Sequence, residues 1–154
     1  MMFRNKEDIS KLISKYKSNG LRIVFTNGCF DLLHAGHLDL LKKASKFGDK
    51  LIIGLNSDAS VKKLKGSSRP IEDQSVRSNN LLDKGFVDNV IIFNELTPKK
   101  LIEQIIPDVL VKGGDYKKED IVGYNEVTKN GGIVKIIPLT PGFSTTLIIN
   151  KSSR

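Results

Sequence analysis

Residues 21–37 read LRIVFTNGCFDLLHAGH, and their character changes twice within this short length. Residues 21–26 are mainly apolar and β-branched, which predicts a strand. A loop of polar and small residues follows, beginning with Asn27-Gly28, and apolar spacing predicts a helix over 36–47. A strand, a polar loop and a helix in this order are typical of the ligand-binding edge of an open parallel sheet.

The same alternation continues along the rest of the chain. Nearly all-apolar runs predict further strands, buried on both faces, at 51–55, 90–93, 108–111 and 133–137. Helices are predicted over 5–18, 72–84, 98–106 and 117–130, with a short one in 144–150. The segment 62–71 is expected to be a mobile basic loop. We therefore predict an α/β fold, a single Rossmann-like doubly wound domain with a mainly parallel five-stranded sheet.

Composition limits the classes of function. The chain has 154 residues, of which 39% are apolar, and no apolar run approaches the ~20 residues that span a membrane. The single cysteine, Cys29, excludes an internal disulfide and favours a reducing cytoplasm. The net charge of +8 suits a polyanionic ligand. Aromatic residues make up only 6%, so we expect no nucleic-acid partner, and we expect no membrane partner.

Both histidines of the chain, His34 and His37, fall at the start of the helix that follows the first loop. Three residues apart, they share one face of that helix. Gly36 leaves room for close approach, and the N–H groups of a helix start attract phosphate. The sequence therefore predicts a phosphate site. Two alternatives stay open: one histidine caps the helix while the other packs, or the pair binds a metal, although two histidines alone are a weak ligand set.

Polar and glycine-rich loops also follow other predicted strands. They are Asn56-Ser57-Asp58, Lys112-Gly113-Gly114-Asp115 and, near the end of the chain, Pro141-Gly142-Phe143-Ser144-Thr145-Thr146. In a parallel sheet such loops lie at one edge, so one ligand can contact several of them.

The motif at 28–37, GCFDLLHAGH, resembles the GxFDxxHxGH signature of the cytidylyltransferase-like nucleotidyltransferases. The resemblance continues through residues 54–58, Leu64-Lys65-Gly66, Arg69-Pro70-Ile71, Arg77, 107–116 and 142–146. It covers nearly the whole chain after residue 20 and is greatest to the branch that adenylylates heptose 1-phosphate. It implies one nucleotidyltransferase domain over 1–154, with an N-terminal helix in 1–20, a catalytic core in 21–150 and a tail in 151–154.

The resemblance implies that the phosphate of a heptose 1-phosphate attacks the α-phosphorus of ATP, with Mg²⁺ on the triphosphate, and that pyrophosphate leaves. His34, His37, Lys65 and Arg77 are then the expected catalytic residues. ATP is expected to contact Thr26, Asn27, Gly28, Cys29, Phe30, Gly36, Lys112, Gly113, Gly114, Asp115, Gly142, Ser144, Thr145 and Thr146. Asp31 and Lys99 are the expected contacts of the sugar phosphate, no protein metal ligand is expected, and the resemblance implies a homo-oligomer.

Several simpler or competing interpretations stay open. Asp31 can form a turn, Gly113-Gly114 can be a tight turn only, Arg77 can be a solvated helix residue and the lysines of 62–65 an ordinary charged loop. Glycerol-3-phosphate cytidylyltransferases and archaeal-type FAD synthetases share the motif. The first carry an arginine before Gly-x-Ser-Thr-Thr, where this chain has Pro138-Leu139-Thr140-Pro141. A non-catalytic nucleotide or nucleic-acid binding module is the alternative from another class.

Overall fold

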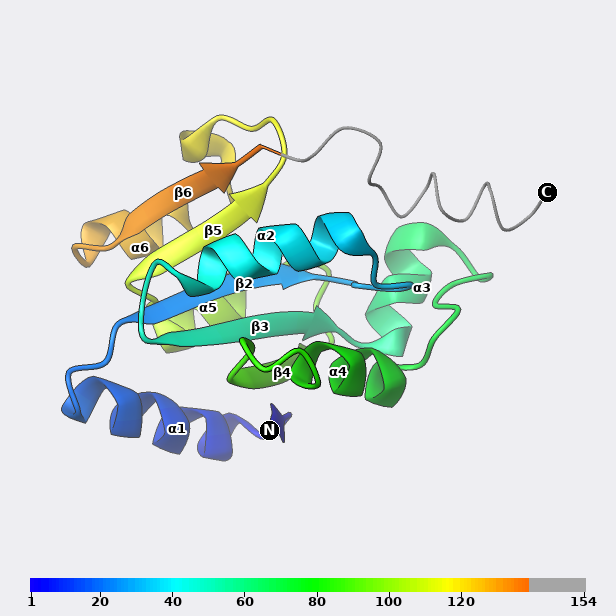
Figure 1. Cartoon of the computed structure of the whole chain (residues 1–154), viewed down its shortest axis with the longest axis horizontal. Helices are drawn as coiled ribbons and strands as arrows, with labels where there is room; N and C mark the ends of the chain where they lie inside the picture. Colours follow the sequence, from blue (N-terminus) through cyan, green and yellow to red (C-terminus); the bar gives the residue numbers. More distant parts are fainter. Residues whose placement is uncertain (139–154) are drawn as a thin grey trace.

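A computed structural model describes residues 1–138. Within that range one sheet of six parallel strands has helices on both faces (Figure 1). The strands are β1 (Met2–Phe3), β2 (Ile23–Gly28), β3 (Lys50–Asn56), β4 (Asn89–Phe93), β5 (Val109–Gly113) and β6 (Ile133–Ile137). The helices are α1 (Lys6–Ser18), α2 (Ala35–Ser45), α3 (Asp58–Lys65), α4 (Gln74–Leu82), α5 (Lys99–Ile105), α6 (Tyr124–Lys129) and the 3-10 helix η1 (Lys118–Asp120).

Successive strand residues point to opposite faces of the sheet, and this divides the core into two layers. Val24 packs in the layer with Leu41 of α2 and Leu81 of α4. Its neighbour Phe25 packs in the other layer, with Ile13 of α1 and Ile102 of α5. Each of these side chains is at most 5% exposed, and burying one contributes about 1.5–3 kcal/mol. The apolar runs of the sequence are therefore strands covered on both sides, which confirms the predicted doubly wound fold.

The strand order explains where a ligand can bind. It is β1-β4-β3-β2-β5-β6, so the chain moves outward from β2 to β3 and β4 and then crosses back to β5 on the other side of β2. All five pairings are parallel. The order in which strands are added to the sheet therefore reverses between β2 and β5. Such a reversal leaves a crevice beyond the carboxyl ends of the two strands, which is the usual ligand site of such sheets.

The structure corrects three details of the prediction. The sheet has six strands within residues 1–138, not five, because β1 adds a two-residue strand beside β4. The first four residues of the expected basic loop at 62–71 belong to helix α3. The expected helix over 117–130 is divided into η1 and α6 by Gly123, whose φ of +95° lies in the left-handed region.

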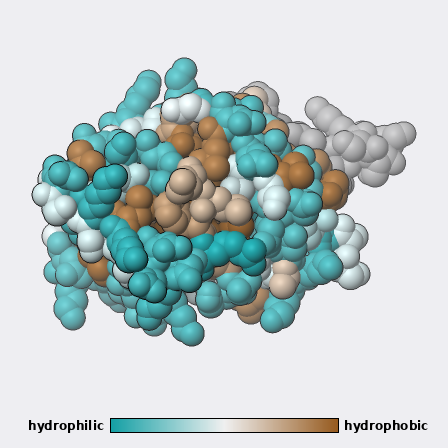
Figure 2. Space-filling view, turned by 90° about the horizontal axis from the view of Figure 1, so that it is seen from below, coloured by the Kyte–Doolittle hydropathy of each residue, from teal (hydrophilic) through white to brown (hydrophobic). Residues whose placement is uncertain are grey.

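The surface seen from below is largely hydrophilic, with an apolar area in its middle (Figure 2). Met1 and Met2 are among the exposed large apolar side chains, at 74% and 39%. No helix within residues 1–138 combines the length and the apolar character needed to cross a membrane.

Candidate functional site

A cavity of about 470 Å³ lies beyond the carboxyl ends of β2 and β5. This volume is within the range of small-molecule sites, ~300–1,000 Å³. The lining residues come from seven separate segments of the chain. They are Thr26, Asn27, Gly28, Cys29, Phe30, Asp31, His37, Leu40, Asn56, Leu64, Lys65, Arg69, Leu96, Thr97, Pro98, Lys112, Gly113 and Val122.

The two histidines cap α2 reciprocally. His34 Nδ1 accepts hydrogen bonds from the N–H groups of Gly36 (3.1 Å) and His37 (3.4 Å), and His37 Nδ1 accepts one from the His34 N–H (3.4 Å). The two rings stack, with centroids 3.7 Å apart and an angle of 23° between their planes. A ring that accepts through Nδ1 carries its proton on Nε2 when it is neutral. Both rings are thereby fixed as Nε2–H donors.

The environment keeps both imidazoles neutral. Burial lowers the pKa of His37 to about 4, helped by the nearby His34 and Lys65. Burial also lowers the pKa of His34. The His34 Nε2 atom is buried and has no hydrogen-bond acceptor within the described part of the chain. The interpretation that one histidine caps the helix is therefore partly right, since His34 caps it, but an unpaired N–H donor remains beside the cavity that His37 lines.

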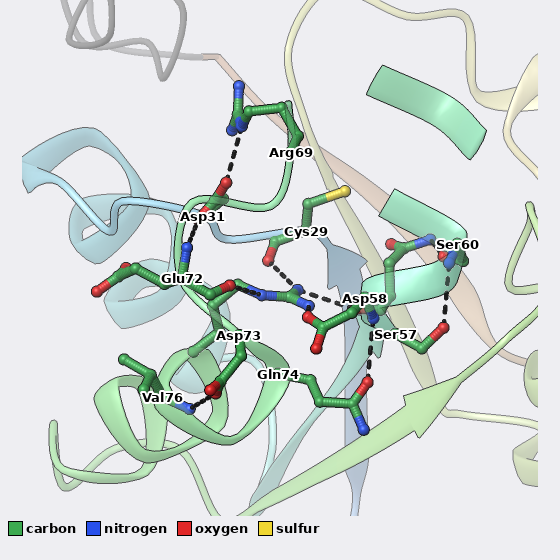
Figure 3. Close-up of polar contacts among 12 residues, drawn as sticks. Cys29, Asp31, Ser57, Asp58, Ser60, Arg69, Glu72, Asp73, Gln74 and Val76 are labelled. Carbon is green, nitrogen blue, oxygen red and sulfur yellow. Dashed lines mark hydrogen bonds and ion pairs between the residues drawn. The ribbon is translucent and has the colours of Figure 1, made fainter. Parts of the chain in front are cut away.

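The loop between β2 and α2 is held in a shape that its own residues disfavour. Phe30 and Leu32 have φ angles of +47° and +58°, in the left-handed region that L side chains seldom adopt. Asp31, between them, is buried and accepts hydrogen bonds from Glu72 N (2.9 Å) and Arg69 Nε (2.8 Å), as Figure 3 shows. It also accepts one from Ile71 N (2.8 Å). Burial raises the pKa of Asp31, but the two backbone donors and Arg69 outweigh it and lower that pKa overall. Asp31 is therefore a buried carboxylate whose hydrogen bonds connect the β2–α2 loop to residues 69–72.

Arg77 connects the same loop to β3 and α3. Its side chain is 0% exposed, and each guanidinium nitrogen donates to a protein oxygen. Nη1 donates to Cys29 O and Asn56 O, Nε to Glu72 O, and Nη2 to Asp58 Oδ1, at 2.8–2.9 Å. The interpretation of Arg77 as a solvated helix residue is wrong. Arg77 also does not line the cavity, where the sequence predicted that it would contact a phosphate. Its hydrogen bonds instead hold the β2 loop against β3 and α3.

Two lysines from different elements supply positive charge to the cavity. Lys65 ends α3, and Lys112 lies near the end of β5 with its Nζ 5.4 Å from the centre of the Tyr116 ring. Burial raises the pKa of the Cys29 thiol, while Lys65, Arg77 and Arg69 act in the opposite direction. The thiol is therefore neutral, as befits a loop residue and not a nucleophile.

The structure brings together seven of the fourteen ATP-binding residues predicted from the sequence. Those that line the cavity are Thr26, Asn27, Gly28, Cys29, Phe30, Lys112 and Gly113, together with His37, Lys65 and Asp31. Those that do not line it are His34, Gly36, Arg77, Gly114, Asp115 and Lys99. The predicted contacts Gly142, Ser144, Thr145 and Thr146 lie outside the described residues.

Sequence reasoning left several lining residues out of the site. The most notable is Arg69, and the others are Leu40, Asn56, Leu64, Leu96, Thr97, Pro98 and Val122. Arg69 had a signal, since Arg69-Pro70-Ile71 is part of the family resemblance, but the spacing alone does not show which arginine faces the ligand. Within residues 1–138 no three His, Cys, Asp or Glu side chains lie together in a way that could hold a metal.

Comparison with known proteins gives this site its family. The family model described as cytidylyltransferase-like matches residues 25–151, which include the β2 loop, the histidine pair and both lysines of the cavity. The chain belongs to the cytidylyltransferase-like family. Membership confirms the prediction of a nucleotidyltransferase.

The chain is also similar to individual proteins, over most of its length. The bifunctional protein HldE of Koribacter versatilis is 51% identical over 95% of the chain, and the protein of the same name from Haemophilus ducreyi is 52% identical over 95%. The chain spans about 30% of the length of these relatives. A crystal structure of the lipopolysaccharide core biosynthesis protein from Thermoplasma volcanium is similar with a TM-score of 0.63 and 28% identity, over 79% of this chain and 98% of that one.

Proposed function

We propose that this chain transfers AMP from ATP to the phosphate of D-glycero-D-manno-heptose 1-phosphate, giving ADP-heptose and pyrophosphate. The observation that carries the proposal is the cavity itself, where neutral imidazole and cationic side chains meet beyond β2 and β5. Identity near 50% to bifunctional HldE proteins supports the choice of acceptor. The name of the structural relative, a lipopolysaccharide core biosynthesis protein, supports it as well.

The reaction needs alignment more than it needs a reactive side chain. An oxygen of the acceptor phosphate forms a bond to the α-phosphorus, while the bond from that phosphorus to the bridging oxygen of pyrophosphate breaks. A phosphate monoester is already ionised near neutral pH, so no strong base is required. The chain therefore has to hold two anionic substrates in line and offset the negative charge that builds up on the transferred group.

The residues of the cavity fit that task. We propose that His37 donates its Nε2–H to an oxygen of the α-phosphate, and that the Nε2–H of His34, which has no acceptor of its own, acts at the same group. A neutral donor is suitable here, because hydrogen bonding in a site shielded from water stabilises a developing charge strongly. Lys65 and Lys112 add positive charge near the triphosphate.

The β2 loop and the glycines complete the nucleotide site. Gly28 lets the Phe30 ring pack closely against the backbone, since a Cβ there would lie 2.9 Å from that ring. We propose that Cys29 and Phe30 contact ATP through their backbone N–H groups and that Gly113 lies beside the base or ribose. Ser144, Thr145 and Thr146 remain the proposed contacts of the outer phosphates.

Mg²⁺ is the proposed partner ion, and the donor set indicates how it would bind. Its expected ligands are mainly the oxygens of the triphosphate, because Mg²⁺ in nucleotide sites is held largely by substrate phosphates and waters. When bound there, Mg²⁺ neutralises charge on the phosphates. A homo-oligomer is also proposed, and size-exclusion chromatography with light scattering tests it.

A pyrophosphate-release panel tests the activity. It crosses the four nucleoside triphosphates with heptose 1-phosphate, glycerol 3-phosphate and FMN, in the presence of Mg²⁺. We expect release with ATP and heptose 1-phosphate. Release with CTP and glycerol 3-phosphate, or with ATP and FMN, would move the chain to another branch of the family. Binding of nucleic acid that weakens steeply with salt, without any pyrophosphate release, would contradict an enzyme.

A further inference from the structure

The segment that carries Arg69 is fixed to the β2 loop by one buried carboxylate. Both Asp31 oxygens are occupied by backbone donors, Oδ2 by Ile71 N and Oδ1 by Glu72 N. The connection is made a second time by Glu72, whose Oε1 accepts from Leu32 N at 3.2 Å. The residues on either side of Pro70 therefore have a defined position relative to the cavity.

Arg69 meets Asp31 through only one of its nitrogens. Nε donates to Oδ2 at 2.8 Å, an oxygen that also accepts from Ile71 N. A guanidinium normally engages a carboxylate with two parallel hydrogen bonds. Here the backbone donors occupy the carboxylate, so the outer end of the guanidinium extends beyond it, as Figure 3 shows.

The outer nitrogen Nη2 has no acceptor. It is buried and makes no hydrogen bond within the part of the chain that the structure describes, while the Arg69 side chain as a whole is 14% exposed. A buried, unpaired donor on a cation is costly, and native proteins rarely leave one without a ligand or water to satisfy it. Arg69 lines the same cavity as His37 and Lys65, so a ligand bound in that cavity would lie next to the Arg69 side chain.

The chemistry of the missing acceptor follows from the donor. A guanidinium held rigidly at Nε presents its remaining N–H groups in a plane, which matches the oxygens of a phosphate. Both proposed substrates carry phosphates. We propose that Arg69, oriented by Asp31, is a further substrate-binding residue that donates to a phosphate oxygen of ATP or of the acceptor. This inference rests on the proposed function, because that function supplies the phosphates.

Direct binding tests the proposal independently of turnover. Calorimetry would compare the full chain with Arg69→Ala, using MgATP, heptose 1-phosphate and inorganic phosphate as separate probes. We expect Arg69→Ala to weaken binding of at least one probe by about 10- to 100-fold, the range for hydrogen bonds to charged groups. Weakening of MgATP alone assigns Arg69 to the nucleotide, and weakening of the sugar phosphate or inorganic phosphate alone assigns it to the acceptor.

A merely structural role is separated by rescue. Millimolar guanidinium ion should restore binding to Arg69→Ala, since it replaces the missing donor. The matched control is Arg22→Ala, which removes an exposed arginine that donates through Nε to Phe47 O before the start of β2. We expect this control to bind all three probes like the original chain.

Two results would overturn the proposal. One is unchanged affinity of Arg69→Ala for all three probes. The other is weakened binding that guanidinium does not restore, accompanied by a large drop in the unfolding midpoint. If the chain binds MgATP but releases no pyrophosphate with any acceptor, the proposed function fails, while the binding comparison still decides the role of Arg69.

Discussion

The loops that follow β2 and β5 line one cavity, but they are held in different ways. The β2 loop has two non-glycine residues with positive φ, and its shape depends on the side chains of Asp31, Glu72 and Arg77. The β5 loop turns at Gly114, with φ of +123°, and is joined to β6 by a backbone hydrogen bond from Gly114 N to Ile137 O. One loop is therefore sensitive to distant side chains, whereas the other depends on its own backbone.

The largest effect on this comparison is expected from Arg77→Met. The variant leaves the carbonyls of Cys29, Asn56 and Glu72 without the donor that now serves them. Loss of a buried charged partner typically costs about 3–5 kcal/mol, so the free energy of unfolding in urea should fall by that order. Asn79→Ala, on the exposed side of the same helix, is the control and should change it by less than ~0.5 kcal/mol. Equal stability of the two variants would show that α4 does not brace the β2 loop.

A second test concerns His37, which lies in the first turn of α2, next to the β2 loop, and lines the cavity. His37→Ala removes the Nε2–H donor, and we expect kcat/KM for pyrophosphate release to fall by more than ~100-fold, as for other transition-state donors. His37→Gln, whose amide N–H₂ reaches about as far, should recover part of the loss. Unfolding curves for both variants separate activity from folding. Undiminished turnover in the alanine variant would remove His37 from the mechanism.

The pH dependence of stability is a third test. Because the pKa of His37 falls from 6.5 to about 4 on folding, the unfolded chain binds more protons than the folded chain between those pH values. Stability should therefore decrease as the pH is lowered from 6.5 towards 4, and His37→Gln should show a shallower decrease in its unfolding midpoint. Asp31 and His34, whose pKa values are also lowered by folding, are present in both proteins, so their difference reports on His37 together with its effect on the stacked His34 ring. Parallel curves would mean that His37 does not titrate in this way.

The smallest effect is expected in the β5 loop, from Gly114→Ala. A Cβ at Gly114 would lie 2.8 Å from the Tyr116 ring, in a backbone conformation that already strains any L residue. Gly131→Ala also has a positive φ, +85°, which is nearer the left-handed region that L residues can adopt, and it has open space around its Cβ. Each should lose about 1 kcal/mol of stability, and Gly114→Ala slightly more because Tyr116 has to move. Thermal unfolding of the two variants measures that difference, and a less stable Gly131→Ala would contradict it.

Periodicity was sufficient to predict most of the fold. Runs such as 51–55 are apolar because both faces of the sheet are covered, so their type and position follow from burial alone. Two elements lack that pattern. β1 has only two residues, and α3 buries Val61 but leaves Leu64 49% exposed, so it shows no apolar stripe. Ser57, which caps α3 by accepting from Ser60 N, was the signal available for that helix.

The site was less predictable than the fold, because its details depend on where long side chains end. The histidine motif and the glycines are local features, and the structure has a cavity at the ends of β2 and β5, where these features predict a ligand. Arg69 and Arg77 are only eight positions apart, and nothing in the sequence tells which of them turns inward. The structure buries Arg77 completely among backbone carbonyls and leaves Arg69 with an unpaired nitrogen beside the cavity. That distinction arises from contacts across the fold.

The reciprocal cap at the start of α2 has a consequence for engineering. Serine, threonine, aspartate and asparagine are the preferred N-cap residues of helices, and His34 is the N-cap of α2. Replacement by serine or aspartate would keep or improve the cap and would abolish the ring nitrogen beside the cavity. Given the proposed role of His34 at the α-phosphate, a screen that selects only for heat resistance would favour replacements at this position that lower turnover.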